Sequence, residues 1–84
     1  MPEVVQFKKS ALKDLKHLDE QLRLRILKEV YKKLQNDGPQ GEKLKGSLEG
    51  LYRIAYASYR VIYALIPSGK LVLRIRHRKD VYKK

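Results

Sequence analysis

The chain has 84 residues, of which 20 are Lys or Arg and nine are Asp or Glu, so its formal net charge is +11. A chain of this length is expected to form a single domain, residues 1–84, with a modest core. It contains no cysteine, which excludes disulfides and thiolate zinc sites, and no apolar run approaches the ~20 residues that span a bilayer. Because the first ten residues also lack the apolar stretch of a signal peptide, we expect a soluble, cytoplasmic protein.

The positive charge is concentrated near the C-terminus. Residues 70–84 contain seven Lys or Arg and only one acidic residue, Asp80. An excess of this size in so small a protein attracts polyanions. Nucleic acid or a strongly acidic protein is therefore the expected partner, and a generally basic, solvated surface is the alternative.

The N-terminal half predicts one strand and two helices. Residues 3–7 (EVVQF) form a short strand candidate, and Ser10 is a candidate N-cap for a helix that runs to about residue 18. Asp19 is the next candidate cap, and the apolar residues at positions 22, 26, 30 and 34 then repeat at helical spacing. The stretch NDGPQG ends this second helix. A tight turn between two amphipathic helices predicts a helical hairpin.

Cations cover the outward faces of both predicted helices. Lys8, Lys9, Lys13 and Lys16 lie on or next to the first helix, and Arg23, Arg25, Lys28, Lys32 and Lys33 lie opposite the apolar stripe of the second. These side chains form a solvated face or contact RNA without sequence preference. His17, beside Lys16, is interpreted as a surface residue.

The C-terminal half predicts three strands, over residues 51–56, 59–66 and 71 to about 77. AS at 57–58 is interpreted as a two-residue hairpin turn and PSG at 67–69 as a three-residue loop. The predicted order is β-α-α-β-β-β. We therefore expect an α+β fold in which two N-terminal helices form a hairpin packed on one face of a mostly antiparallel four-stranded sheet.

The strand pattern places several arginines on one face of this sheet. With the turn at 57–58, Ala55 lies opposite Arg60, and Arg53 lies diagonal to Arg60 on the same face. A three-residue loop at 67–69 then places Arg60 opposite Arg76, with Arg74 on the same face. A two-residue loop would instead set the aliphatic residues of the last strand beside Arg60. The first register is preferred because it gathers apolar side chains under the helices: Tyr59, Val61, Tyr63, Leu65, Leu71, Leu73 and Ile75.

A basic cluster on a sheet face is unfavourable unless an anion binds it. Like charges directly opposite each other destabilise a sheet by up to ~1 kcal/mol, whereas guanidinium groups bind phosphate oxygens bidentately. The arginines therefore predict a phosphate-binding face. The alternative is that acidic residues such as Glu42 or Glu49 reach over and neutralise the cluster.

Three segments in this order carry a family resemblance: KLKGSLEGLYRI, then YRVIYAL, then HRKDVYKK at the C-terminus. Behind two N-terminal helices, they resemble the RelE toxins of the RelE/ParE toxin–antitoxin superfamily, over nearly the whole chain. The resemblance implies a RelE-like fold and a toxin that enters the ribosomal A site and cuts mRNA there. A ribose 2′-hydroxyl would attack the adjacent phosphate, leaving a cyclic phosphate and a free 5′-hydroxyl.

The resemblance also implies partners. They are the ribosome with its mRNA and rRNA, and a cognate antitoxin protein, expected to dock an acidic, amphipathic segment in a hydrophobic groove around the helices or sheet edge. No metal and no other cofactor are implied, and the sequence has no His/Asp/Glu cluster at ligand spacing.

The resemblance assigns catalytic roles to four residues. Arg53 would hold or deprotonate the 2′-hydroxyl, Arg60 would stabilise the phosphorane-like transition state, and Arg78 would help to protonate the leaving oxygen. Tyr82 would stack on an mRNA base. For His77, both a structural and a catalytic role stay open, because imidazole is the usual acid or base in metal-free RNA cleavage. Further residues expected to contact RNA are Lys43, Lys45, Arg74, Arg76, Lys79 and Lys83.

One position departs from the family pattern. The family usually has a second basic residue two places after Arg53, and here that residue is Ala55. This departure suggests a weakened nuclease. The alternative interpretations are a ParE-type gyrase inhibitor, disfavoured by the combination of Arg60, Arg78 and Tyr82, and a non-enzymatic RNA-binding relative, favoured by Ala55.

Overall fold

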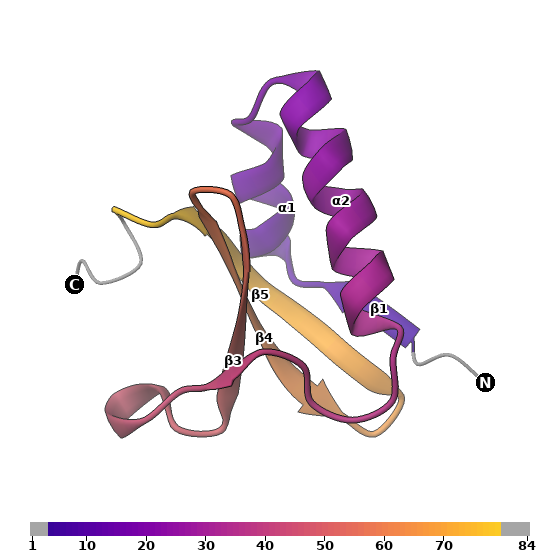
Figure 1. The fold of residues 1–84 in the computed structure, drawn as a ribbon, viewed down its shortest axis with the longest axis vertical. Coiled ribbons are helices and arrows are strands. Elements are labelled where there is room, and N and C mark those ends of the chain that lie inside the picture. Colours follow the sequence, from indigo (N-terminus) through magenta and orange to yellow (C-terminus); the bar gives the residue numbers. More distant parts are fainter. Residues whose placement is uncertain (1–3, 80–84) are drawn as a thin grey trace.

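The computed structural model describes residues 4–79 (Figure 1). Two helices lie on one side of a twisted sheet, with α2 the longer of the two. In chain order the elements are β1 (Val4–Phe7), α1 (Lys9–Lys16), α2 (Glu20–Leu34), β2 (Glu42–Lys43), a short 3₁₀ turn (Gly46–Leu48), β3 (Leu51–Tyr56), β4 (Tyr59–Ile66) and β5 (Gly69–His77). Neither described helix is long and apolar enough to cross a membrane.

The sheet has five strands in the order β1-β5-β4-β3-β2, so the predicted count of four is wrong by one strand. β1 runs parallel to β5, and the other neighbours are antiparallel. The additional strand, β2, is only two residues long and pairs Glu42 with Arg53 and Lys43 with Tyr52. Two residues are too few to produce a recognisable alternation, which is why the sequence pattern did not predict this strand.

The helices begin close to the predicted positions, with one cap assigned wrongly. Asp19 caps α2 as predicted, and its carboxylate accepts a hydrogen bond from Leu22 N at 2.9 Å. Ser10 is not a cap: α1 begins at Lys9, and the Ser10 hydroxyl donates instead to the carbonyl of Leu73 on β5 at 2.6 Å. A residue 63 positions away in sequence therefore takes the hydroxyl that local pattern had assigned to the helix end.

The core lies between the helices and one face of the sheet, as predicted. Its helical side is an apolar stripe, and its sheet side comes from β3, β4 and β5. The buried residues are Ala11, Leu15, Ile26, Val30, Leu34, Ile54, Val61, Tyr63, Val72 and Ile75. Because the apolar side chains face this layer, the opposite face of the sheet remains available to the arginines.

The turn between β4 and β5 is a two-residue turn at positions 67–68, so the predicted three-residue loop is wrong. Next to this turn Tyr63 lies opposite Val72, and Leu71 lies opposite Ala64 on the face away from the helices. Val72 therefore occupies the buried place opposite Tyr63 that was predicted for Leu73. Lys70 occupies the place opposite Leu65 that was predicted for Leu71.

A bulge in β5 restores the predicted register further along. Leu73 has no partner on β4, and beyond it Ile62 pairs with Arg74 and Arg60 pairs with Arg76. One extra residue thus lets apolar side chains face the core on both sides of the bulge. It also returns Arg74 and Arg76 to the open face, as predicted.

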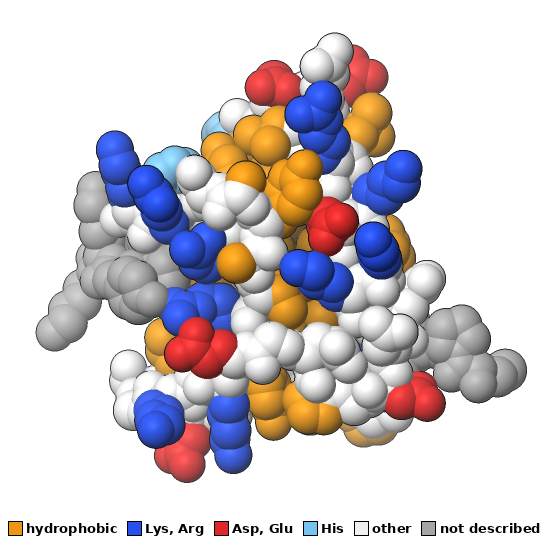
Figure 2. Space-filling model, viewed as in Figure 1, with side chains coloured by type: hydrophobic (Ala, Val, Ile, Leu, Met, Phe, Trp, Pro, Cys, Tyr) orange, Lys and Arg blue, Asp and Glu red, His pale blue; other side chains and the backbone are white. Residues whose placement is uncertain are grey.

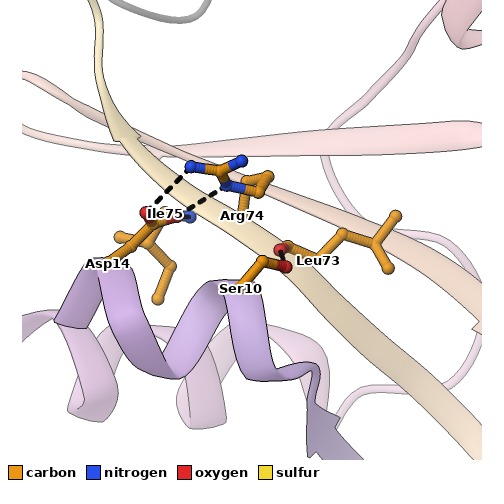
Figure 3. A network of polar contacts seen from close by, with 5 residues as sticks. All are labelled: Ser10, Asp14, Leu73, Arg74 and Ile75. Atoms are coloured by element: carbon orange, nitrogen blue, oxygen red, sulfur yellow. Dashed lines mark hydrogen bonds and ion pairs between the residues drawn. The ribbon is translucent and has the colours of Figure 1, made fainter. Parts of the chain in front are cut away.

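Helix α1 covers the part of β5 that β1 does not reach. β1 pairs only with residues 69–72 of β5. Beyond that point Ser10 takes the Leu73 carbonyl, and the Asp14 carboxylate accepts from Ile75 N at 2.8 Å (Figure 3). Side chains one helical turn apart therefore satisfy edge groups that would otherwise lack a neighbouring strand.

Candidate nucleic-acid interface

The predicted arginine face is confirmed by the strand register. Arg53 pairs with Ile62, Ile62 pairs with Arg74, and Arg60 lies between Ala55 and Arg76. Paired residues point to the same side of a sheet. Four guanidinium-bearing residues from three adjacent strands therefore share the face that lies opposite the helices.

Two of these arginines are held by carboxylates. Arg53 Nη2 donates to Glu42 Oε2 at 2.5 Å, and Arg74 donates to both carboxylate oxygens of Asp14 at 2.9 and 3.0 Å (Figure 3). The hydrogen bond to Asp14, supported by the charge of that carboxylate and opposed by partial burial, raises the pKa of Arg74 above its usual value. The neutralisation suggested for Glu42 is thus confirmed at Arg53, whereas Glu49 lies elsewhere.

The other two arginines have no carboxylate partner within residues 4–79. Arg60 Nη1 donates to the carbonyls of Ala57 and Tyr59 at 3.2 and 3.1 Å, which folds the side chain over the β3–β4 turn. These two contacts use only one of the nitrogens of its guanidinium group. Arg60 and Arg76 therefore have N–H groups available to an incoming anion.

An open cavity of about 560 Å³ lies at the outer edge of β3. Among the described residues that line it are three cations and one acid; the lining comprises Lys33, Gln40, Gly41, Glu42, Arg53, Ile54, Ala55 and Arg60. Its single carboxylate is already hydrogen-bonded to Arg53. The cavity therefore carries a net positive charge and combines a carboxylate with several N–H donors.

The loop that joins α2 to β2 forms part of the wall of this cavity, and core side chains hold this loop in place. The buried Tyr63 hydroxyl accepts from Gln40 N at 2.6 Å and donates to the carbonyl of the same residue. Lys70, also fully buried, donates from Nζ to the carbonyl of Asn36 at 2.9 Å. Two side chains from the core side of the sheet thus hold both ends of the loop that delivers Glu42.

His77 and Arg78 lie at the far end of β5. His77 pairs with Tyr59, so it points to the helix side, and its ring meets the Tyr59 ring edge-on at a centroid distance of 5.3 Å. Its Nδ1 accepts from Lys79 N at 3.2 Å. Arg78 is exposed, and its backbone N–H donates to Ser58 of the β3–β4 turn. The Arg78 backbone therefore lies beside the β3–β4 turn over which Arg60 folds, whereas His77 does not line the cavity.

The remaining predicted RNA contacts fall in different places. Lys43 and Lys45 line a second hollow of about 380 Å³ together with Glu49, and this hollow shares no lining residue with the arginine cavity. Lys79 is exposed after β5. Tyr82 and Lys83, the predicted base-stacking and C-terminal RNA contacts, lie outside the described residues.

Arg76 lines a hollow next to helix α1. A hollow of about 500 Å³ between α1 and the edge of β5 is lined by Ser10, Lys13, Asp14, His17, Arg74 and Arg76. Asp14 is occupied by Arg74 and Ile75, so the remaining charges there are positive. His17, interpreted from sequence as a surface residue, therefore lines a basic hollow beside Arg76.

No sequence pattern singles out Lys33 or Asp14. Lys33 was one of several outward cations of the second helix, and in the structure its Nζ donates to the carbonyl of Ala55 at 3.2 Å. Asp14 is 60 positions from its partner Arg74. For Asp14, its spacing of four residues from Ser10 was the available signal, because both side chains then lie on one helix face.

Cations also dominate the wider surface. Figure 2 shows Lys and Arg side chains spread over one face of the molecule, along the helices and over the strands, and they outnumber the Asp and Glu side chains there. The residues described here contain no group of three His, Asp or Glu that could hold a metal ion. The candidate interface is thus rich in basic side chains, and the Glu42 carboxylate lies in the cavity at the edge of β3.

Comparison with known proteins connects this arrangement to a family. Residues 5–82 match the family model described as the ParE toxin of the type II toxin–antitoxin system parDE. No curated protein matched the chain. Several solved structures did.

The similar structures include toxin–antitoxin complexes from bacteria and archaea. A chain of the RelBE2 complex from Mycobacterium tuberculosis is 23% identical with a TM-score of 0.83, over 93% of this chain and 100% of that one. A chain of the RelB–RelE complex from Methanococcus jannaschii is 30% identical with a TM-score of 0.69, over 93% of this chain and 95% of that one. The isolated E. coli RelE toxin is 23% identical with a TM-score of 0.71, over 89% of this chain and 83% of that one. The match of the family model over nearly the whole chain, and the archaeal likeness at 30% identity, show that this chain belongs to the RelE/ParE superfamily of type II toxin–antitoxin toxins.

Proposed function

We propose that this toxin is a ribosome-dependent endoribonuclease that inhibits translation by cutting mRNA in the A site. The single observation that carries the proposal is the cavity lined by Arg53 and Arg60, from adjacent strands, and by Glu42, whose carboxylate contacts Arg53. Guanidinium N–H groups in this geometry suit the non-bridging oxygens of a phosphodiester. The likeness to RelE structures supports the fold required for this site.

The chemistry follows from what each group can do. A ribose 2′-oxygen attacks the adjacent phosphorus, the bond from phosphorus to the 5′-oxygen breaks, and a 2′,3′-cyclic phosphate and a 5′-hydroxyl remain. Arg60 and Arg53 stabilise the added negative charge of the phosphorane, a contribution that is commonly the largest at such sites. Arg78, just after β5, donates a hydrogen bond to the leaving 5′-oxygen, which takes up its proton from water.

The proton of the 2′-hydroxyl needs an acceptor. Guanidinium groups stay protonated in proteins and cannot accept a proton. Glu42 is the carboxylate that lines the cavity, and its contact with Arg53 orients both groups. We therefore assign proton acceptance to Glu42 and binding of the phosphate to Arg53, which refines the role expected from the sequence.

The ribosome supplies what the protein lacks. The cavity is open and is lined by no histidine, so a free RNA strand could bind there but would not be oriented for in-line attack. In the A site the message would be held in that orientation. A cognate antitoxin would neutralise the toxin, and the apolar side of its amphipathic segment would fit the exposed Leu12 and Leu24 of the helices.

The decisive variant is Arg60→Ala. It should reduce mRNA cleavage in a bacterial translation extract by about 100-fold or more, because one preorganised donor to the transition state is lost. Primer extension on the extracted message measures the cut sites. Arg25→Ala, which removes an exposed cation from α2, is the matched control and should cut normally.

Two outcomes would contradict the proposal. One is undiminished cleavage by Arg60→Ala with an unchanged melting temperature. The other is an intact message in the presence of wild-type protein. If DNA supercoiling by gyrase fails while the message stays intact, the ParE-type alternative is correct. A gyrase supercoiling assay is needed because the family model that matches this chain is described as a ParE toxin.

A further inference from the structure

We propose that Lys33 of α2 is a third phosphate-binding residue of the RNA site, acting with Arg53 and Arg60. This inference rests on the proposed ribonuclease function and deepens it. It adds to the arginines of the strands a cation from a helix that packs on the other side of the sheet. The expected ligand is the phosphodiester of a single-stranded RNA.

The position of Lys33 follows from an incomplete sheet edge. β2 pairs only with Arg53 and Tyr52, so the edge of β3 beyond Arg53 has no neighbouring strand among residues 4–79. The side chain of Lys33 reaches this edge, where its Nζ donates to the Ala55 carbonyl at 3.2 Å. The buried neighbours Val30 and Leu34 fix this part of the helix against the core.

The electrostatic balance of the cavity favours an anion near this ammonium group. Lys33, Arg53 and Arg60 contribute three positive charges, and Glu42 contributes one negative charge that Arg53 already engages. The other partner of Lys33 is Glu29, four residues earlier on the helix, at 3.8 Å. That pair is partly exposed and weak, whereas a phosphate would accept a charge-assisted hydrogen bond.

The geometry leaves room for Nζ to change partner. Lysine has a flexible four-carbon stem and three rotatable donors, so its ammonium group can move from a carbonyl to a bound phosphate without moving the helix. Ala55, whose carbonyl holds Nζ, ends in a single methyl group and lines the same cavity. A long cationic side chain at position 55 would therefore place its charge in the cavity that Lys33 serves.

This relation gives a charge-relocation experiment. Binding of a fluorescent single-stranded RNA with 2′-O-methyl riboses, which cannot be cleaved, is measured by anisotropy at fixed salt. Lys33→Ala should weaken binding about tenfold, the size expected of one charge-assisted hydrogen bond. Lys33→Arg should bind nearly as the wild type does. The double variant Lys33→Ala/Ala55→Lys should recover most of the lost affinity.

Two controls separate the proposed contact from general effects. Lys32→Ala removes the same charge from the neighbouring position, which is exposed and does not line the cavity. Glu29→Gln removes the helix ion pair but keeps Lys33. Both should bind RNA within about twofold of the wild type, because a surface ion pair contributes little. All variants should retain the wild-type melting temperature within a few degrees.

The outcomes distinguish the inference from the proposed function. If the wild type binds and cuts RNA but Lys33→Ala binds as Lys32→Ala does, the inference is wrong and the function stands. If Lys33→Ala loses affinity and Ala55→Lys fails to recover it, the loss comes from the helix rather than from a phosphate contact, which also overturns the inference. A wild type that neither binds nor cuts RNA overturns the function itself.

Discussion

At Gly41 the loop after α2 lies directly against β3, and this close approach places Glu42 beside Arg53. Gly41 has a φ of +81°, and a Cβ at this position would lie 2.2 Å from the Arg53 carbonyl oxygen and 2.7 Å from Ile54 Cγ2. Gly38, three residues earlier, has a similar φ of +77° but open space around it. A comparison of the two positions therefore distinguishes the cost of the backbone conformation from the cost of the steric contact.

Gly41→Ala should destabilise the protein more than Gly38→Ala. Both replacements force alanine into the left-handed region, at about 1–2 kcal/mol each, but only Gly41→Ala also pushes β2 away from β3. Urea unfolding of the two variants measures the difference in the free energy of unfolding. Equal destabilisation by both variants would show that the contact with Arg53 is not sterically constrained.

At the scale of the elements, α1 substitutes for a strand along the end of β5. Ser10 and Asp14 occupy the backbone groups of Leu73 and Ile75, and Asp14 also holds Arg74 (Figure 3). Exposed strand edges invite pairing with other chains, and a helix laid along the edge prevents it. Helix α1 therefore stabilises the sheet that carries the arginines, and it also lines the hollow beside Arg76.

Asp14→Ala should cost more stability than Arg74→Ala. The first variant leaves the Ile75 N–H without its acceptor and should lower the free energy of unfolding by about 1–3 kcal/mol. The second removes only an ion pair whose arginine side chain is 43% exposed, and such pairs contribute about 0–1 kcal/mol. Thermal unfolding compares them. A larger loss in Arg74→Ala would assign the stability to the ion pair instead.

At the scale of the whole molecule, part of the net charge of +11 lies in a row of cations across the sheet. Arg53, Arg60 and Arg76 cross the open face from β3 to β5, and Lys13 continues this series on α1. Adjacent strands lie ~5 Å apart, so the series is long enough to follow several nucleotides rather than one. We expect an RNA strand to cross the sheet roughly perpendicular to the strands.

The salt dependence of RNA binding tests this path. For a single strand, the logarithm of affinity falls with the logarithm of salt concentration by about 0.7 for each neutralised phosphate. Arg76→Ala should therefore reduce the slope by about 0.7. Lys28→Ala, which removes an exposed charge from α2, should leave the slope unchanged. Equal slopes for the wild type and Arg76→Ala would place the RNA elsewhere.

The sequence by itself determined both helices, four of the five strands and the face on which the arginines lie. Strand alternation and helical periodicity are local properties, so residues 51–56 and 59–66 were predicted with the bounds that the structure has, and Arg60 was placed opposite Arg76. The family segments also lie within short stretches of chain, and the superfamily that they indicated is the one that the chain belongs to.

Only the tertiary structure decided which partners these arginines meet. The bulge at Leu73, the two-residue strand β2 and the contacts of Asp14 with Arg74 all depend on packing between distant segments. The same holds for Lys33, whose approach to Ala55 spans 22 positions and depends on how α2 crosses the sheet edge. Periodicity predicts which way a side chain points, but its neighbour across space is selected by the burial of the whole core.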